Sequence, residues 1–173
     1  MALESLDIQN KLQDTFGEKV KHFRTEYDMF VFEVESPSIV EVMRYLKEEP
    51  SLNFNFLTDV CGVHYPENPV EEQFCVVYHM HNWFENKRIR IKAFLSGEHP
   101  HIETVSNLFL SADWQERETY DFYGIHFDGH PNLCRILNMD EMISFPLRKE
   151  FPMEDSGRTD KDDRFFGRTI NNA

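Results

Sequence analysis

The chain has 173 residues and a formal net charge of −13, and 40% of its residues are apolar, among them 16 phenylalanines. A chain of this length and composition can bury a hydrophobic core and form one domain with an appendage. The negative charge argues against nucleic acid or an anionic membrane surface as a direct partner. We expect neither a secretory leader nor a membrane-spanning helix, because no apolar run approaches the roughly 20 residues that cross a bilayer.

The first third of the chain alternates between helical and strand-like patterns. Apolar residues at steps of four predict a helix over residues 5–16, which a glycine ends. An aromatic and β-branched run predicts a strand over residues 27–34. Ser36 and Pro37 then offer an N-cap and a first-turn proline for a second helix, which Pro50 ends.

The middle of the chain has three strand patterns followed by two helical ones. Residues 54–64 read as a strand, and residues 74–81 and 88–95 alternate around a short connection, which predicts a hairpin. Alternation with charge on one side indicates a sheet whose other face is covered. Helices are expected at residues 103–110 and 112–123. The predicted fold class is therefore α+β, with an antiparallel or mixed sheet covered by helices on one face.

The pattern changes after Gly124. From residue 125 to residue 173 there is no sustained apolar period, although aromatic and proline residues recur, and so long an aperiodic stretch is unusual inside a compact domain. Its last part, residues 146–173, has six basic and six acidic residues, so the rest of the chain carries the whole net charge. We therefore expect a body over residues 1–124, followed by a long extended C-terminal arm over residues 125–173 that packs on partner subunits.

A dense motif runs from Trp114 to Pro152. Its members are Glu116, Arg117, Glu118, Asp121, Gly124, Phe127, Gly129, His130, Pro131, Arg135, Pro146, Leu147, Arg148, Lys149, Phe151 and Pro152. The motif resembles the signature of the 30 kDa (or C) subunit family of NADH:quinone oxidoreductase, respiratory complex I. Two positions depart from the family pattern: Cys134 stands where a second basic residue is common, and Ser144-Phe145 stands where Gly-His is frequent.

The resemblance implies a structural subunit of the peripheral arm that carries no redox centre. In such an enzyme FMN and iron–sulfur clusters lie in partner subunits and pass electrons from NADH to quinone, coupled to proton translocation. The resemblance also implies support for assembly of the quinone-reducing module, an arm that packs along the D subunit of the complex, and the B and I subunits as candidate neighbours. Membrane association is expected only through the complex, on the cytoplasmic face of the bacterial inner membrane. A homologous subunit of a membrane-bound hydrogenase-type complex is the alternative within this class.

The helical part of the motif places two carboxylates on a predicted apolar face. That face consists of Trp114, Glu118, Asp121, Phe122 and Ile125. Buried carboxylates need partners, and the arginines within reach are Arg117, Arg135 and Arg148. We therefore expect ion pairing at Glu118 and Asp121 rather than acid–base chemistry. Gly124 and Gly129 are expected to supply turns with positive φ.

Neither the cysteines nor the histidines form a recognisable metal motif. Cys61, Cys75 and Cys134 are isolated and lack CxxC spacing, so this chain alone builds no zinc or iron–sulfur site. The histidine pairs 79/81 and 126/130 lack a third ligand at a clear spacing. No nucleotide-binding glycine loop is present either. The alternative from another functional class is a metal-dependent hydrolase that would use Glu116, Glu118, Asp121, His126 and His130.

Overall fold

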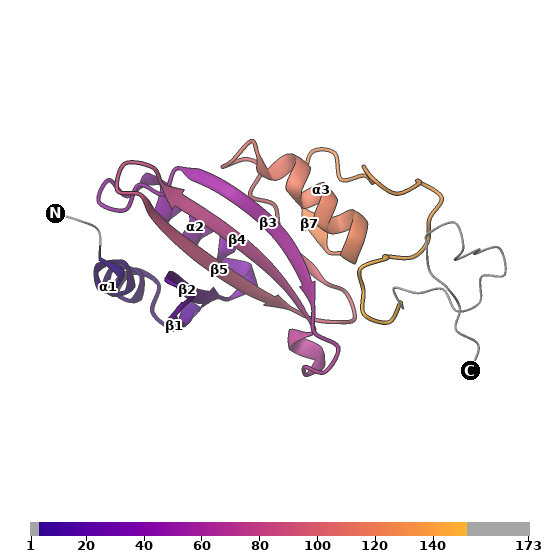
Figure 1. Cartoon of the computed structure of the whole chain (residues 1–173), viewed down its shortest axis with the longest axis horizontal. Coiled ribbons are helices and arrows are strands. Elements are labelled where there is room, and N and C mark those ends of the chain that lie inside the picture. Colours follow the sequence, from indigo (N-terminus) through magenta and orange to yellow (C-terminus); the bar gives the residue numbers. More distant parts are fainter. Residues whose placement is uncertain (1–3, 152–173) are drawn as a thin grey trace, which may run out of the picture.

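The computed structural model describes residues 4–151, which form two β-sheets and three α-helices (Figure 1). The helices are α1 (Ser5–Phe16), α2 (Ile39–Glu48) and α3 (Ala112–Tyr123). The strands are β1 (Val20–Glu26), β2 (Met29–Val34), β3 (Phe56–His64), β4 (Phe74–Asn82), β5 (Lys87–Leu95), β6 (His101–Glu103) and β7 (His126–Asp128). None of the helices in this part of the chain is long and apolar enough to cross a membrane.

The larger sheet has the strand order β1-β2-β5-β4-β3. β2 and β5 pair in parallel, whereas the other neighbours are antiparallel, so the sheet is mixed. One face carries the core, where a row of buried side chains crosses four strands: Phe32, Ile91, Tyr78 and Val60. The apolar sides of α1 and α2 belong to the same core, and α2 lies behind the sheet in Figure 1. The predicted α+β class is confirmed.

Helix α3 covers the outer edge of β3. Three of the side chains on and just before α3, spaced four residues apart, hydrogen-bond to β3 carbonyls: Ser111 to Leu57 at 3.2 Å, Gln115 to Thr58 at 3.3 Å and Thr119 to Val60 at 3.4 Å. Gly62 permits this approach, because a Cβ there would lie 2.7 Å from the ring of Tyr123. An exposed strand edge invites pairing with another chain, and α3 removes that edge here.

Several predicted elements are confirmed, and the differences have local causes. The helices at residues 5–16 and 112–123 and the β4–β5 hairpin lie where the sequence predicts them. The strand β1 was not predicted, because a register shift and a φ of 55° at His22 interrupt its alternation. The Ser36 side chain makes no cap bond; a short 3-10 turn precedes α2 instead.

The predicted helix at residues 103–110 is wrong. Glu103 ends β6, and the residues after it form turns. The carboxylate of Glu116 accepts the N–H of Val105, and the hydroxyl of Thr104 accepts the N–H of Ser106. The N–H of Thr104 also donates to the carbonyl of Asp128 at 2.9 Å, which continues the β6–β7 pairing into the predicted helix, so a tertiary contact overrides the local pattern.

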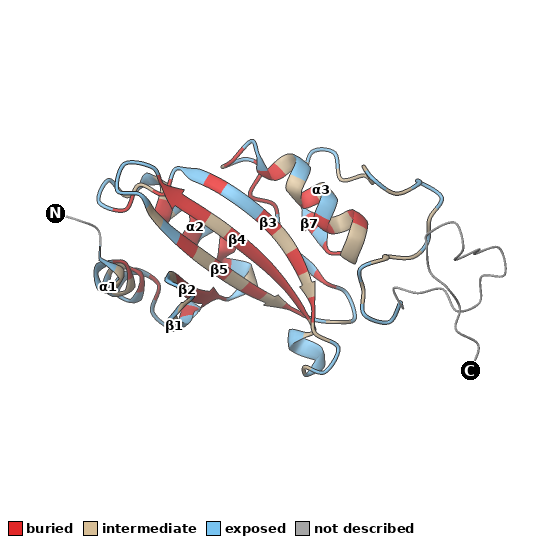
Figure 2. Ribbon diagram, in the orientation of Figure 1, coloured by how far each residue is buried: buried red, intermediate tan, exposed pale blue. Residues whose placement is uncertain are grey.

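The first residues after Gly124 join the packing of the body. β7 pairs in parallel with β6, and Ile125 and Phe127 are buried in the core (Figure 2). From residue 129 to residue 151 the chain forms turns and bends without a helix or strand. Pro152 and the rest of the predicted arm lie outside the described residues, so the division into a body of residues 1–124 and an arm of residues 125–173 stays a proposal.

Candidate functional site

The motif residues converge where the end of α3 meets residues 129–151, and Asp121 lies at the centre of this contact. Its buried carboxylate accepts five hydrogen bonds: from Arg135 Nη1 at 2.7 Å, from the N–H groups of Ile136, Leu137 and Asn138 at 3.1, 2.8 and 3.0 Å, and from Asn138 Nδ2 at 3.0 Å. Burial alone would raise the pKa of Asp121, but these donors hold it well below its usual range. The carboxylate therefore fixes the turn at residues 135–138 against the helix.

Arg135 carries that attachment further along the chain. Its Nη1 also donates to the backbone carbonyl of Asp121 at 2.9 Å, and its Nη2 donates to the carbonyls of Met142 at 2.7 Å and Ser144 at 3.0 Å. The guanidinium carbon lies 4.9 Å from the ring centroid of Phe145, and the side chain is only 8% exposed. One guanidinium thus ties residues 142–145 to α3, since its several N–H donors reach the carboxylate and three carbonyls at once.

Phe145 begins a stack of side chains that reaches the large sheet. The guanidinium carbon of Arg148 lies 4.7 Å from the ring centroid of Phe145 and 4.9 Å from that of Phe74. The ring of His64 stacks on Phe74 at 4.5 Å, with an interplanar angle of 9°. Arginine faces aromatic rings favourably, by about 0.5–2 kcal/mol per contact. The stack of Arg135, Phe145, Arg148, Phe74 and His64 therefore joins the aperiodic segment to β3 and β4.

Gly124 makes this stack possible in two ways. Its φ of 71° ends α3 in the left-handed region, where Arg148 Nε donates to the carbonyl of Tyr123 at 2.7 Å. A Cβ at residue 124 would lie 2.5 Å from the ring of Phe145 and 2.6 Å from Arg148. The predicted positive φ is confirmed here and at Gly129, whose φ is 79°.

A second buried carboxylate, Glu116, holds the other end of α3. Its Oε1 accepts the N–H of Val105 at 2.8 Å, and its Oε2 accepts the hydroxyl of Thr104. Burial raises the pKa of Glu116 to about 7, and nearby Asp113 adds to that rise against the opposing hydrogen bonds.

His130 packs beside Glu116 with its side chain fully buried. Its Nδ1 accepts the N–H of Asn132 at 3.1 Å, which places the ring proton on Nε2, 3.1 Å from the carbonyl of Asp113. Glu116 Oε2 lies 3.8 Å from the same Nε2. This histidine therefore links the turn after Gly129 to the first turn of α3.

The predicted buried face of α3 is wrong at Trp114 and Glu118, whereas Asp121 and Ile125 of that face are buried. Trp114 and Glu118 are exposed, and the buried residues of the helix are Ala112, Glu116, Thr119 and Asp121. The reason is that Ser111, Gln115 and Thr119 hydrogen-bond to β3, which turns Trp114 outward. Arg117 pairs with neither predicted acid: it donates to the carbonyl and sulfur of Cys134 at 3.3 and 3.0 Å and lies over the Trp114 ring. Of the three arginines predicted as partners, Arg135 is the one that forms an ion pair with Asp121.

Except for Phe127 on β7, the remaining motif residues lie on or near the surface of residues 129–151. Gly129, Pro131, Leu147, Lys149 and Phe151 are exposed, Pro146 is half-buried and Phe127 is buried. Apolar side chains also point outward along this segment: Leu137 is 64% exposed, Met139 73%, Ile143 97%, Leu147 45% and Phe151 40%. We name Leu137, Met139 and Ile143 the arm-side patch. Buried contacts hold this segment in place while its apolar side chains are exposed to solvent, and such a surface is typical of a protein interface.

Of the five groups that a hydrolase would need, only Glu116 and His130 lie together. Asp121 is held by Arg135, His126 Nδ1 lies 3.1 Å from Asp128, and Glu118 is exposed. Within residues 4–151 no three His, Cys, Asp or Glu side chains meet in a way that could hold a metal ion.

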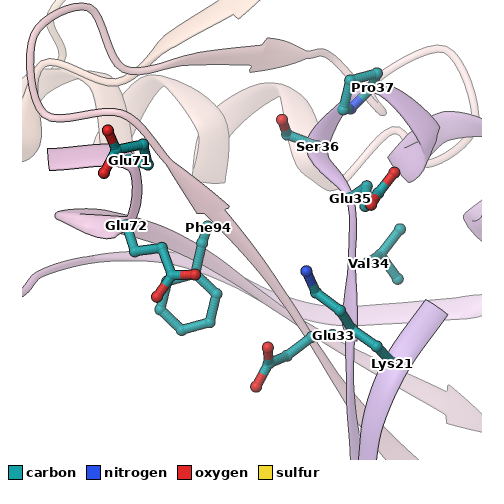
Figure 3. A pocket seen from close by; sticks show the side chains of 9 residues that line it. All are labelled: Lys21, Glu33, Val34, Glu35, Ser36, Pro37, Glu71, Glu72 and Phe94. Atoms are coloured by element: carbon teal, nitrogen blue, oxygen red, sulfur yellow. The ribbon is translucent and has the colours of Figure 1, made fainter. Parts of the chain in front are cut away.

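A pocket of about 250 Å³ lies away from α3, with Lys21 and Glu33 facing Glu72 and Phe94 (Figure 3). Its Glu33 is already paired with His22 and Arg24.

Comparisons with known proteins agree with the motif. The family model described as "Respiratory-chain NADH dehydrogenase, 30 Kd subunit" matches residues 32–157. The second C subunit of NADH-quinone oxidoreductase from Rhizobium meliloti is 45% identical over 140 residues, which cover 80% of this chain and 75% of that protein. The NADH-quinone oxidoreductase C subunit of Coxiella burnetii is 33% identical, with 87% of this chain and 79% of that protein covered.

Solved structures share the fold. The trypsin-resistant fragment of Nqo5 is 28% identical, with a TM-score of 0.61, and the match covers 75% of this chain and all of the fragment. A chain in the membrane-bound sulfane sulfur reductase, an archaeal respiratory membrane complex, has a TM-score of 0.72 over 86% of this chain and 85% of its own. At 23% identity that second likeness is one of fold alone.

Proposed function

Because this chain belongs to the family of the respiratory-chain NADH dehydrogenase 30 kDa subunit, we propose that it is a non-redox structural subunit of the peripheral arm of NADH:quinone oxidoreductase, complex I. In this proposal FMN and the iron–sulfur clusters lie in partner subunits, and this chain supports assembly of the quinone-reducing module. It would sit at the cytoplasmic face of the bacterial inner membrane and reach the membrane only through the complex.

The observation that carries the proposal is the direction in which the motif side chains point. Asp121, Arg135 and Arg148 face inward and hold backbone carbonyls and N–H groups or stack on rings. They give residues 129–151 a fixed path, and the arm-side patch of Leu137, Met139 and Ile143 is turned to solvent on that path. A motif built this way supports binding of a partner rather than chemistry.

The proposed partner at the arm side is the D subunit of complex I, with the B and I subunits as further candidates. Burying an exposed apolar side chain of this size contributes about 1.5–3 kcal/mol before ordering losses, so the patch can supply a useful share of an interface. The arm that continues toward residue 173 is proposed to extend the same interface, with Phe165 and Phe166 as anchors.

The patch gives a direct test by affinity purification from membranes in mild detergent. Replacing Ile143, which is 97% exposed, by aspartate should remove most co-purifying subunits and leave the melting temperature of the isolated chain unchanged. Leu110→Asp is the matched control, because Leu110 is 91% exposed but lies at the opposite end of α3. Full recovery of the subunits with Ile143→Asp would contradict an interface at this patch.

The isolated chain is expected to be colourless and redox-silent. Its three cysteines are scattered, and within the described residues they are unpaired. Metal analysis and absorption spectra of the folded, tag-free chain check this. Stoichiometric iron, flavin or zinc would show that the chain holds a centre of its own and would end the proposal of a non-redox role.

Deleting Met153 to Ala173 is expected to leave the body folded, because the described core lies upstream of the cut. A relative supports this expectation, since a trypsin-resistant fragment of Nqo5 matches 75% of this chain. The melting temperature of the truncated chain should stay within a few degrees of the full chain, while its recovery in the purified complex falls. Unfolding of the truncated chain would place the deleted residues in the core.

A hydrogenase-type membrane complex is the second candidate, because subunits of that class share this fold, as does a chain of the archaeal membrane-bound sulfane sulfur reductase. The two candidate complexes differ in the subunits that deliver electrons to them. Flavin- and NADH-binding subunits among the co-purifying proteins would favour complex I, and a set of partners without them would favour the second candidate.

A further inference from the structure

The turn between β4 and β5 lies at the end of the sheet remote from residues 129–151 (Figure 1). β4 runs from Phe74, which contacts Arg148, to Asn82, which leads into this turn. At about 3.4 Å per residue, its nine residues put the two ends roughly 27 Å apart. The turn is therefore a separate surface from the arm-side patch.

Three aromatic side chains gather at this end and face solvent. Phe84 is 77% exposed, Trp83 69% and Phe56 49%, and the rings of Trp83 and Phe56 lie 6.5 Å apart. We name these three residues the hairpin-tip patch. Aromatic side chains exposed together in this way are a feature of protein-binding sites, where tryptophan in particular supplies much of the binding energy.

The backbone of the turn is held in place by buried polar contacts. Asn82 is 3% exposed; its Oδ1 accepts the N–H groups of Phe84 and Glu85, both at 3.0 Å, and its Nδ2 donates to the carbonyl of Leu52 at 2.7 Å. Asn86 completes the turn with a φ of 47°. The aromatic rings are thus presented by a preorganised turn, which lowers the entropy lost on binding.

The turn that carries Trp83 and Phe84 has a net positive charge on a negatively charged chain. Lys87 and Arg88 follow the turn, with Glu85 as the one carboxylate between Asn82 and Arg88. Within residues 4–151 neither Lys87 nor Arg88 is part of an ion pair. On a chain with a net charge of −13, the turn therefore presents two cations next to its aromatic residues.

We propose that the hairpin-tip patch docks into an apolar pocket rimmed by carboxylates on a second subunit, so that this chain bridges two partners from opposite ends of its sheet. The inference rests on the proposed function, since it assumes a multi-subunit complex. Exposure and charge favour this occupant: the exposed aromatic rings need an apolar surface, and Lys87 and Arg88 would pair with carboxylates at its edge.

Site-specific crosslinking in the assembled complex tests the bridge. A photo-reactive phenylalanine analogue placed at Phe84 is expected to crosslink to one subunit, and the same analogue at Ile143 to a different one. The peptide reached from Phe84 should contain aspartate or glutamate next to apolar residues. Crosslinks from both positions to the same subunit, or none from Phe84 in a complex that crosslinks from Ile143, would overturn the bridge and leave the proposed function standing.

Substitutions test the chemistry of the surface in the full-length chain. The double variant Trp83→Asp, Phe84→Asp should lower recovery of the subunit reached from Phe84 at least tenfold and spare the subunit reached from Ile143. The double variant Lys87→Glu, Arg88→Glu should lower the same recovery, most strongly at low salt. Val70→Asp, a half-exposed apolar residue near the opposite end of β4, is the control and should change neither.

The remaining outcomes separate the two proposals. If the tip variants keep every subunit but lose co-sedimentation with vesicles of anionic and zwitterionic lipid, the occupant is a lipid surface and this proposal is wrong. If the unaltered chain recovers no respiratory subunit at all, the proposed function is contradicted. The proposed bridge, which rests on that function, is then contradicted as well. Unchanged melting temperatures of the tip variants show that any loss comes from the surface and not from the fold.

Discussion

Replacing Asp121 by alanine is expected to destabilise the isolated chain by roughly 3–5 kcal/mol, the range for breaking one partner of a buried ion pair. The variant leaves the guanidinium of Arg135, which is 8% exposed, without its carboxylate. It also leaves the N–H groups of residues 136–138 without their acceptor. Both sets of lost contacts belong to the turn at residues 135–138. We therefore expect residues 135–145 to detach from α3 and the unfolding free energy of the chain to fall.

The same helix supplies the control. Glu118 is exposed and three residues before Asp121, so Glu118→Ala changes the same charge on the same helix and should shift the unfolding free energy by no more than about 0.5 kcal/mol. Urea or thermal unfolding of the two variants and the unaltered chain measures the difference. Equal effects of the two substitutions would show that Asp121 contributes only as a surface charge.

The pH dependence of this difference is also defined. Because the folded-state pKa of Asp121 lies below its usual value of 3.8, its contribution is present above the unfolded pKa and is lost as the pH falls through the folded one. The gap between Asp121→Ala and the unaltered chain should therefore be constant from neutral pH to about pH 5 and should narrow below pH 4. A gap that grows on acidification would have the wrong sign for this ion pair.

In the cell, Asp121→Ala is expected to lower the amount of assembled complex and to leave the turnover of each assembled complex unchanged. The reason is that the carboxylate is buried among donors of its own chain and has no path to a substrate. Native gels give the amount, and quinone reduction divided by that amount gives the turnover. Normal assembly with abolished turnover would favour a catalytic carboxylate instead.

The parts of the fold that local chemistry determines could be predicted from the sequence. The apolar period and the glycine stops placed α1 and α3, and alternation placed β4 and β5. What local patterns could not show is which side of α3 meets the sheet. That side is set by Gly62 on β3, 57 residues before Thr119, because only there can the helix approach the strand closely. The sequence therefore pointed to Glu118 where the structure buries Glu116.

The site was predictable only in part for the same reason. Arg135 was among three candidate partners for Asp121, and its pairing is a contact across 14 residues. The stack on Phe74 and His64 joins residues more than 60 positions apart, as does the bond from the N–H of Lys149 to His64 Nδ1 at 3.0 Å. No spacing rule in the sequence relates such residues. Phe145, where the family often has histidine, fills the position between two guanidinium groups.

Glu116 leads to a second large effect, on the pH dependence of stability. Its pKa rises from 4.5 in the unfolded chain to about 7 in the folded one, so between those values the folded chain keeps a proton that the unfolded chain has lost. The contribution of Glu116 to the unfolding free energy should therefore fall as the pH rises through this window, by on the order of 3 kcal/mol in total at 1.36 kcal/mol per pKa unit. His64 and His79, whose pKa values burial lowers, contribute with the opposite sign, so the Glu116 contribution is measured as a difference between variants. The ionisable groups that face Glu116 are Asp113 on its own helix, His130 from the following turn and Tyr78 from β4.

Glu116→Gln keeps the shape of the protonated acid and removes its titration. The amide oxygen can accept the N–H of Val105, and the hydroxyl of Thr104 can turn to accept from the amide nitrogen. We expect the variant to match the unaltered chain near pH 4.5 and to exceed its stability by on the order of 3 kcal/mol at pH 8. Glu118→Gln, on the exposed side of α3, should keep the original slope. Urea unfolding across this pH range measures both, and a Glu116→Gln variant that is less stable at pH 8 would mean that the buried carboxylate is ionised and paired.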